Sequence, residues 1–309
     1  MPMCLPEHHF PPSRSRRPRA LVATARIAAA RGNARWRSMA LICAATLVGG
    51  SPARAETASD WSAPSGTAVR LIAGGLKEGH LDAGVEIRLA PGWKTYWRYP
   101  GDSGVPPRFD WSKSENVGDV AVFWPAPTRF DDGAGSSSIG YKHDVVLPLA
   151  IAPKRAGEPM KLRLDLDFAV CEKICQPAHA SLVLDVPAGG AAPSPAALID
   201  ARTTVPPAVA LGAPGPLGIE EIALGQEAGG PVLRVKARVD GKADLFVEGP
   251  TEDWALPLPA SAAGIDGRAL FIVPVEGAPK GADIARTPLR FTLIDGTRAV
   301  EIEAAPAAR

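Results

Sequence analysis

The sequence lacks most features that mark helical, membrane-spanning or nucleic-acid-binding proteins. Its 309 residues include only four cysteines and 6% aromatic residues, and 34 basic residues nearly balance 33 acidic ones. A formal net charge of +1 gives no electrostatic basis for binding a polyanion, so no nucleic-acid partner is expected. Helical periodicity is scarce, whereas 31 glycines and 32 prolines are present, which favours an all-β protein.

The first 55 residues have the composition of an export signal with an upstream extension. Residues 1–38 are rich in arginine and poor in acids, and they lead into an apolar run, Met39–Gly50. That run is too short to span a bilayer. It is followed by the A-x-A sequence of residues 53–55, so we predict cleavage before Glu56 and export to a periplasm. The mature chain is then expected to have no membrane span.

Cleavage would remove two of the four cysteines. Cys171 and Cys175 would remain, four residues apart. In an oxidising compartment, two cysteines this close form a disulfide with each other or cycle through one. A permanent disulfide across so small a loop would stabilise the fold by about 2 kcal/mol at best, which makes a redox role the stronger interpretation. A metal site is a third interpretation of the pair. His179 continues the four-residue spacing, and two thiolates with an imidazole suit Cu(I) or Zn.

Alternating apolar and polar residues predict β-strands in a first domain, residues 56–190. The clearest alternation lies in residues 162–170 and 180–186, which form a predicted hairpin with the cysteines at its tip. Other predicted strands cover residues 67–73, 81–89, 117–123 and 144–151. Pro148 places the last of these at a sheet edge or a bulge, because proline cannot donate a ladder hydrogen bond.

The composition changes to alanine, proline and glycine in a predicted linker, residues 191–216. Within it, Ser194 as N-cap and Pro195 at the first position predict a short helix ending near Thr204. Residues 217–309 contain further short strands but neither cysteine nor histidine, so no chemistry is expected there. The fold class predicted is all-β, with two immunoglobulin-like β-sandwich domains in tandem.

The predicted hairpin suggests how the two sulfurs meet. Because even-numbered residues of the first strand face the core, Cys171 falls on the polar face and is not predicted to be a core cysteine. If residues 172–174 form a helical turn, the two Cα atoms lie about 6 Å apart, within the range of a disulfide. A bond at such an exposed tip is accessible to an attacking thiolate.

Three nearby segments have no assigned chemistry. The sequence GAGSSSIG, residues 133–140, is predicted to be a solvated, mobile loop. The rings of Trp93, Tyr96, Trp97 and Tyr99 are expected to pack against the first sheet, with a partner-docking face as the alternative. The loop that follows, residues 100–107, has turn residues and is expected to shape the rim of the cysteine site.

Four sequence blocks together resemble one known family. They are GWKTYWRYPGDSGVPP at residues 92–107, WPAPTRF at 124–130, IGYKHDVVLPL at 139–149, and VCEKICQPAHASLVLDVP at 170–187. In this order, over about residues 65–187, they resemble the periplasmic N-terminal domain of the DsbD family of thiol:disulfide interchange proteins, in particular its ScsB-like branch. The tandem arrangement of β domains also fits that branch.

The resemblance implies an immunoglobulin-like sandwich that acts as a thiol:disulfide oxidoreductase without an organic cofactor. By the resemblance, Cys175 forms the mixed disulfide with partners, and Cys171 resolves it. The electron donor would be a membrane thiol-transport protein encoded as a separate polypeptide, and the acceptors would be oxidised thioredoxin-fold proteins of the periplasm.

The family also covers its cysteines with a cap loop of acidic and aromatic residues. Here the cap loop would be residues 131–141. The usual cap aromatic is replaced by Ala134, so Phe130 or Tyr141 is the expected substitute. The predicted cap and rim residues are therefore Phe130, Asp131, Asp132, Tyr141 and His179.

The sequence is also compatible with two alternatives to electron transfer. A periplasmic copper-binding module would use Cys171, Cys175 and His179 as ligands. A structural adaptor would keep a permanent disulfide between the two cysteines.

Overall fold

The computed structural model describes residues 57–133, 135–191 and 193–307. The predicted signal peptide and its cleavage site at Glu56 lie outside the described residues. Within them, no helix is long and apolar enough to cross a membrane.

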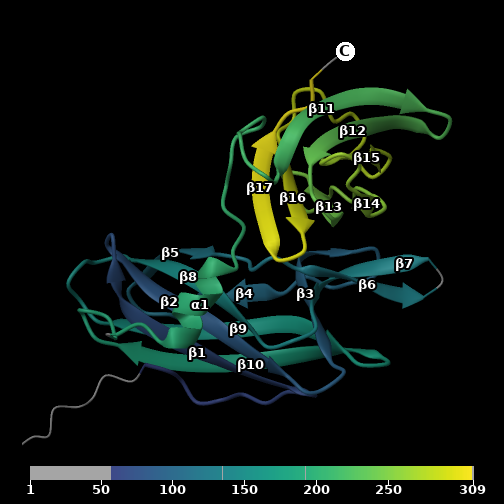
Figure 1. The fold of residues 1–309 in the computed structure, drawn as a ribbon. Coiled ribbons are helices and arrows are strands. Elements are labelled where there is room, and N and C mark those ends of the chain that lie inside the picture. The colour runs from purple at the N-terminus through teal and green to yellow at the C-terminus, as the bar shows by residue number, and fades with distance from the viewer. Residues whose placement is uncertain (1–56, 134, 192, 308–309) are drawn as a thin grey trace, which may run out of the picture. The chain divides into compact units, whose positions relative to one another are not determined.

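The first domain consists of two antiparallel sheets (Figure 1). One sheet has the order β1-β2-β8-β5, from β1 (Thr67–Lys77), β2 (His80–Leu89), β8 (Val145–Pro153) and β5 (Val117–Val122). The other has the order β10-β9-β3-β7-β6, with β4 also paired to β9. Its strands are β10 (Cys175–Val186), β9 (Met160–Cys171), β3 (Lys94–Gly101), β7 (Ser136–Tyr141), β6 (Thr128–Gly133) and β4 (Arg108–Asp110).

The core of this domain forms where the apolar faces of the two sheets meet. Leu71 on β1 and Leu149 on β8 belong to the same buried cluster as Leu166 on β9 and Leu184 on β10. Alternation along β9 and β10 places every second residue in this core and its neighbour on the outer face. The predicted hairpin is therefore confirmed, and it leaves one face of the sheet free for a site.

Pro148 lies neither at a sheet edge nor at a bulge, contrary to the prediction. Strand β8 is paired to β2 on one side and to β5 on the other. In an antiparallel strand, the N–H and C=O of one residue point to the same neighbour. The carbonyl of Pro148 accepts a hydrogen bond from the N–H of Phe123, just beyond the end of β5. Pro148 therefore lacks an N–H only at a point where β5 has already ended, so no ladder hydrogen bond between β8 and β5 is lost.

The second domain is also a sandwich of antiparallel sheets, so the predicted all-β tandem fold is confirmed. One sheet has the order β11-β12-β15 and the other the order β14-β13-β16-β17. Their cluster of buried apolar side chains includes Leu233, Trp254, Phe271 and Phe291. The strands are β11 (Gly218–Glu227), β12 (Gly230–Arg238), β15 (Arg268–Pro274), β14 (Ala262–Ala263), β13 (Lys242–Glu248), β16 (Leu289–Asp295) and β17 (Arg298–Ala304).

The segment between the sandwiches contains the predicted short helix, α1 (Ala196–Thr203), but its cap differs. Pro195 holds the N-cap position, and no side chain caps the helix. The hydroxyl of Ser194 instead donates a 2.9 Å hydrogen bond to Asp82 on β2, whose carboxylate also accepts from Arg202 of α1. The buried carboxylate of Asp82 thus binds the Ser194 hydroxyl, which was expected to cap the helix. This hydrogen bond attaches the segment to the first sandwich.

Candidate functional site: the cysteine pair and its tyrosine

Cys171 and Cys175 face each other across the β9–β10 hairpin and form a disulfide. Cys171 ends β9, Cys175 begins β10, and residues 172–174 make the turn between them. The predicted helical turn is wrong, because the strands continue to the tip and bring the two Cα atoms to 4.1 Å. The ladder itself, and not a local helix, places one sulfur opposite the other.

The two cysteines differ in their access to solvent. Cys175 is exposed, whereas Cys171 is only 2% exposed and packs with Ala169 and Tyr96. Cys171 lies on the outer face of the sheet, as its position in β9 predicted, but it is nevertheless buried because Tyr96 covers that face. A foreign thiol or disulfide can therefore reach the sulfur of Cys175 more easily than that of Cys171.

Tyr96 contacts both sulfurs. Its hydroxyl oxygen lies 3.0 Å from Sγ of Cys171 and 3.0 Å from Sγ of Cys175. Disulfide sulfurs have no proton, so in this form the hydroxyl is the donor. Burial and the negative charge of Asp132 raise the pKa of Tyr96, although a hydrogen bond with Ser138 opposes the shift. Tyr96 thus remains protonated at neutral pH and can donate to a sulfur that becomes negatively charged.

Strand pairing and two glycines set the position of Tyr96. Lys94 pairs with Cys171, and Tyr96 pairs with Gly140 of β7, so Tyr96 stands on the same face as the disulfide. A Cβ on Gly140 would lie 2.0 Å from the carbonyl oxygen of Thr95, which shows how closely β7 approaches β3. A Cβ on Gly104 would lie 2.6 Å from Cδ1 of Tyr96, so the loop after β3 packs directly on the ring.

Asp132, a predicted cap residue, is the centre of a polar cluster beside Tyr96. Its carboxylate is 2.5 Å from Nζ of Lys94 and accepts a 2.9 Å hydrogen bond from Ser103. The hydroxyl of Ser138 also donates to this carboxylate. Partial burial opposes ionisation, but Lys94, Ser138 and Ser103 together hold the pKa of Asp132 below its ordinary value. The ionised Asp132 therefore ties β6 to β3, to β7 and to the loop after β3.

The segment predicted as a loop contributes to a β-hairpin within the described residues. Strand β7 begins at Ser136, and Ser138 is fully buried. Asp131 pairs with Ser137 across the hairpin. Phe130 is 2% exposed, and the ammonium groups of Lys94 and Lys142 each lie 5.0 Å from its ring centroid. Phe130 thus lies in strand β6 with its ring buried beneath the two lysine side chains.

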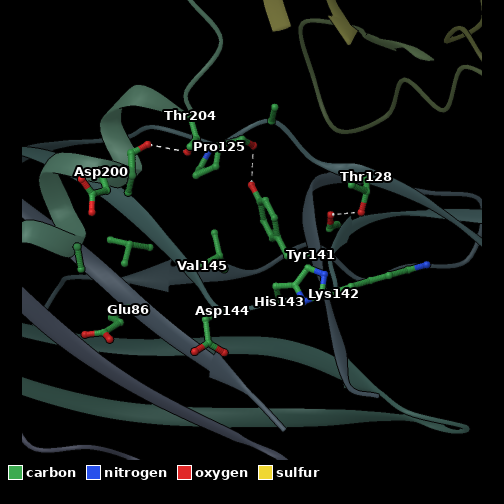
Figure 2. Close-up of a pocket in the computed structure, with 15 residues that line it drawn as sticks. Glu86, Pro125, Thr128, Tyr141, Lys142, His143, Asp144, Val145, Asp200 and Thr204 are labelled. Atoms are coloured by element: carbon green, nitrogen blue, oxygen red, sulfur yellow. Dashed lines mark hydrogen bonds between the residues drawn. The ribbon is translucent and has the colours of Figure 1, made fainter. Parts of the chain in front are cut away.

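Tyr141 lies away from the sulfurs. Its ring is buried on the core face, its hydroxyl donates a 2.9 Å hydrogen bond to the carbonyl of Pro125, and burial raises its pKa well above the ordinary value. This ring lines a cleft of about 450 Å³. Figure 2 shows the ring among the other lining residues. The cleft is lined by residues around β7, β8 and α1 and includes neither cysteine.

His179 stands on the same face of β10 as Cys175, but two alternate positions further along. A rise of about 3.3 Å per residue places it about 13 Å away. Its ring is engaged by Asp167, 2.7 Å from Nδ1, and by Ser181, 3.0 Å from Nε2. Among the described residues, no three His, Cys, Asp or Glu side chains are grouped to hold a metal ion. The structure does not bring His179 together with the two thiols.

The sequence assigned no individual role at this site to four of its residues, namely Lys94, Tyr96, Ser103 and Ser138. The aromatic segment at residues 93–99 was recognised, but nothing in it distinguished Tyr96 from rings that fill the core. The expected role of residues 100–107 as a rim agrees with the contact of Ser103 to Asp132. The signal that could have found Tyr96 is its alternation with Thr95 and Trp97, which places it on the outer face of a strand.

Two family models match this chain. Residues 63–187 match the model of the N-terminal domain of the thiol:disulfide interchange protein DsbD, and residues 204–309 match a domain of unknown function (DUF8393). The predicted resemblance is confirmed for the first domain. No curated protein matches the chain.

A solved structure shares the fold across both sandwiches. It is the crystal structure of the N-terminal periplasmic domain of ScsB from Proteus mirabilis, with a TM-score of 0.63 and 23% sequence identity. The match covers 82% of this chain and 99% of that chain. At this identity the likeness establishes a common fold.

Proposed function

Because residues 63–187 form a domain of the DsbD N-terminal type, we propose that the protein is a periplasmic thiol:disulfide exchange protein. Its Cys171/Cys175 pair would pass electrons from a membrane thiol relay to oxidised thioredoxin-fold partners. The observation that carries this proposal is the pairing of an exposed Cys175 with a buried Cys171 under one tyrosine hydroxyl.

The reduced pair would act in two exchange steps. The Cys175 thiolate attacks one sulfur of a partner's disulfide, a mixed disulfide forms, and the partner's other sulfur leaves as a thiolate. Cys171, after losing its proton to solvent, attacks Sγ of Cys175 and releases the partner's second sulfur as a thiolate. Two electrons pass to the partner, and its two thiolates take up two protons from solvent. The pair is left as the disulfide seen here, and the membrane relay reduces it again.

Tyr96 can stabilise a thiolate on either sulfur. A hydrogen bond to a charged group contributes about 1.5 to 3 kcal/mol, more than one to a neutral group. Because the hydroxyl lies within 3.0 Å of each sulfur, it can stabilise the thiolate on Cys175 before attack and a developing charge on Cys171 afterwards. The exposure of Cys175 then decides which sulfur a partner meets first.

The turn beside Cys175 offers a contact for a partner. Ile174 is 74% exposed, and Val105, in the loop that covers Tyr96, is 54% exposed. Apolar side chains exposed beside a reactive group are common in protein–protein contact sites. A thioredoxin-fold partner would therefore bring its own cysteines to Cys175 by packing against these two side chains.

A trapping experiment tests the proposal. The exported full chain carrying Cys171→Ala is mixed with oxidised bacterial thioredoxin and run on a non-reducing gel. Acid quenching and alkylation of free thiols before the gel preserve the adduct, because the freed second thiol of thioredoxin can reverse the exchange. A covalent adduct that dithiothreitol cleaves is expected, because Cys175 can form the mixed disulfide and Cys171 is no longer present to resolve it toward release of reduced thioredoxin. The matched control, Cys175→Ala, should give at least tenfold less adduct because Cys171 is buried. If no adduct forms and the wild-type disulfide also resists dithiothreitol, the protein is an adaptor with a permanent disulfide.

A further inference from the structure

The pairing of strand β3 with its sheet neighbours is interrupted between Tyr96 and Gly101. The strand pairs with β9 only at Lys94 and Thr95, and its pairing with β7 shifts register between Tyr96 and Gly101. Residues 97–100 thus continue the strand without a regular ladder. The ladder therefore fixes Tyr96 from the residues before it, while the residues after it need other contacts to hold them in place.

The second sandwich contacts these residues one after another. The Trp97 ring lies 5.9 Å from that of Phe246, centroid to centroid, and Phe246 belongs to the buried cluster of the first domain. Arg98 forms a two-pronged ion pair with Glu248, with bonds of 2.9 and 2.8 Å, and a further 2.5 Å bond to Glu301. An arginine fork that binds carboxylates in this way fixes orientation as well as distance.

Further contacts hold Tyr99 and the β6–β7 hairpin. Tyr99 donates a hydrogen bond to the carbonyl of Leu256. Arg129, three residues before Asp132 on β6, lies 3.0 Å from the carboxylate of Asp244 and donates a 2.7 Å hydrogen bond to the carbonyl of Pro259. Both structural supports of the site, the strand of Tyr96 and the strand of Asp132, are therefore bound to the domain that has no cysteine.

Arg98 is the central contact because its charge is partly desolvated. Only 17% of its side chain is exposed. Burial opposes its charge, but Glu248 and Glu301 outweigh that effect and raise the pKa of Arg98. Removing one member of such a cluster leaves the others buried with an uncompensated charge, so the segment must move to rehydrate them.

We propose that the second sandwich positions the redox site: Arg98 and Arg129 hold β3 and β6 so that Tyr96 stays within hydrogen-bonding distance of the sulfurs. Arg98 is a positioning residue that acts through Tyr96. The inference rests on the proposed exchange function.

The test compares Arg98→Gln with Arg290→Gln in the exported chain that carries Cys171→Ala. Arg290 lies 3.5 Å from the same Glu301 but belongs to the second sandwich itself, so it is a matched control. The pH dependence of the rate at which iodoacetamide alkylates Cys175 gives the pKa of its thiol. With Arg98→Gln, we expect this pKa to rise and the rate at pH 7 to fall about threefold or more, because the thiolate loses the Tyr96 hydrogen bond. Arg290→Gln should keep the parent profile.

If Arg98→Gln keeps the parent profile, the inference is overturned. Should that variant fail to fold, Glu248→Gln removes the opposite charge with little change of shape. A raised pKa of the Cys175 thiol in that variant then supports the inference, and an unchanged profile overturns it. The measurement needs no protein partner, so it is separate from the trapping experiment. Absence of an adduct with Cys171→Ala, together with a wild-type disulfide that resists dithiothreitol, defeats the proposed function, whereas an unchanged alkylation profile in an exchanging protein defeats only this inference.

Discussion

The hydroxyl of Tyr96 lies 3.0 Å from Sγ of Cys175, the more exposed of the two sulfurs. In the oxidised form the hydroxyl can only donate to the disulfide. In the reduced form the same position allows it to stabilise a thiolate, so the chemistry of the pair should depend on this one oxygen.

Tyr96→Phe is expected to raise the pKa of the Cys175 thiol by about one unit, because a hydrogen bond to a charged sulfur is lost. The pH profile of iodoacetamide alkylation in a Cys171→Ala background measures this. Tyr141→Phe is the control, since that hydroxyl is bound to Pro125, away from the sulfurs. Equal profiles for the two variants would remove Tyr96 from the mechanism.

Gly140→Ala should distort the site through the backbone. A Cβ at this position would lie 2.0 Å from the carbonyl oxygen of Thr95, so β7 must move away from β3. We expect the free energy of unfolding to fall by about 2 kcal/mol, as in other overpacked interiors. Urea denaturation measures it. Gly189→Ala, where a Cβ meets no atom within 4 Å, should be close to neutral, and a neutral Gly140→Ala would contradict this account.

Asp82 should make stability depend on pH in the acid range. Burial favours its neutral form, but Lys77, Ser194 and Arg202 outweigh burial and hold the pKa of Asp82 below 3.8. A carboxylate with a lowered pKa stabilises the fold above its unfolded-state value, and that contribution is lost as the pH falls through the folded-state pKa.

Asp82→Asn is therefore expected to lower the free energy of unfolding by about 2 kcal/mol at pH 7 and by clearly less near pH 3. Urea denaturation at both pH values measures this difference. The control is Asp119→Asn, at an exposed residue of β5. A difference that does not shrink in acid would mean that the charge of Asp82 is not what stabilises the fold.

Ile174→Asp should weaken partner docking without changing the intrinsic chemistry of the pair. The exposed side chain adjoins Cys175, and a charge there would oppose burial against an apolar partner surface. We expect the rate of exchange with oxidised thioredoxin to fall about tenfold, while reduction of the disulfide by dithiothreitol stays within about twofold. Ile265→Asp, 76% exposed on the second sandwich, is the control for surface charge. Equal losses in both assays would assign Ile174 to the pair itself and not to docking.

The sequence predicted those parts of the protein that alternate strongly. The β9–β10 hairpin with its cysteine tip follows from the regular apolar spacing of the two strands. Strand β7 was missed because residues 136–138 are all serine, and its conformation comes from pairing with β3 and β6. Pairing between distant segments leaves no local periodicity to read.

The residues of the site also divide into those that the sequence identifies and those that only the folded sheet brings together. The two cysteines and Asp132 stand out in the sequence by residue type and by resemblance. The roles of Tyr96 and Ser138 depend on which residues the ladder places side by side, and on Gly140 allowing that approach. Tyr141 was expected in the cap because it is aromatic, but its parity on β7 turns it toward the core.

The register of the β9–β10 hairpin is set by main-chain pairing along both strands, so we expect Cys171 and Cys175 to stay opposite each other when the disulfide is reduced. Gaining or losing two electrons thus requires almost no rearrangement of the main chain. Under the proposed function, an incoming protein would then meet nearly the same surface in both redox forms, and the charge and hydrogen bonding at the sulfurs would distinguish the reduced form from the oxidised one.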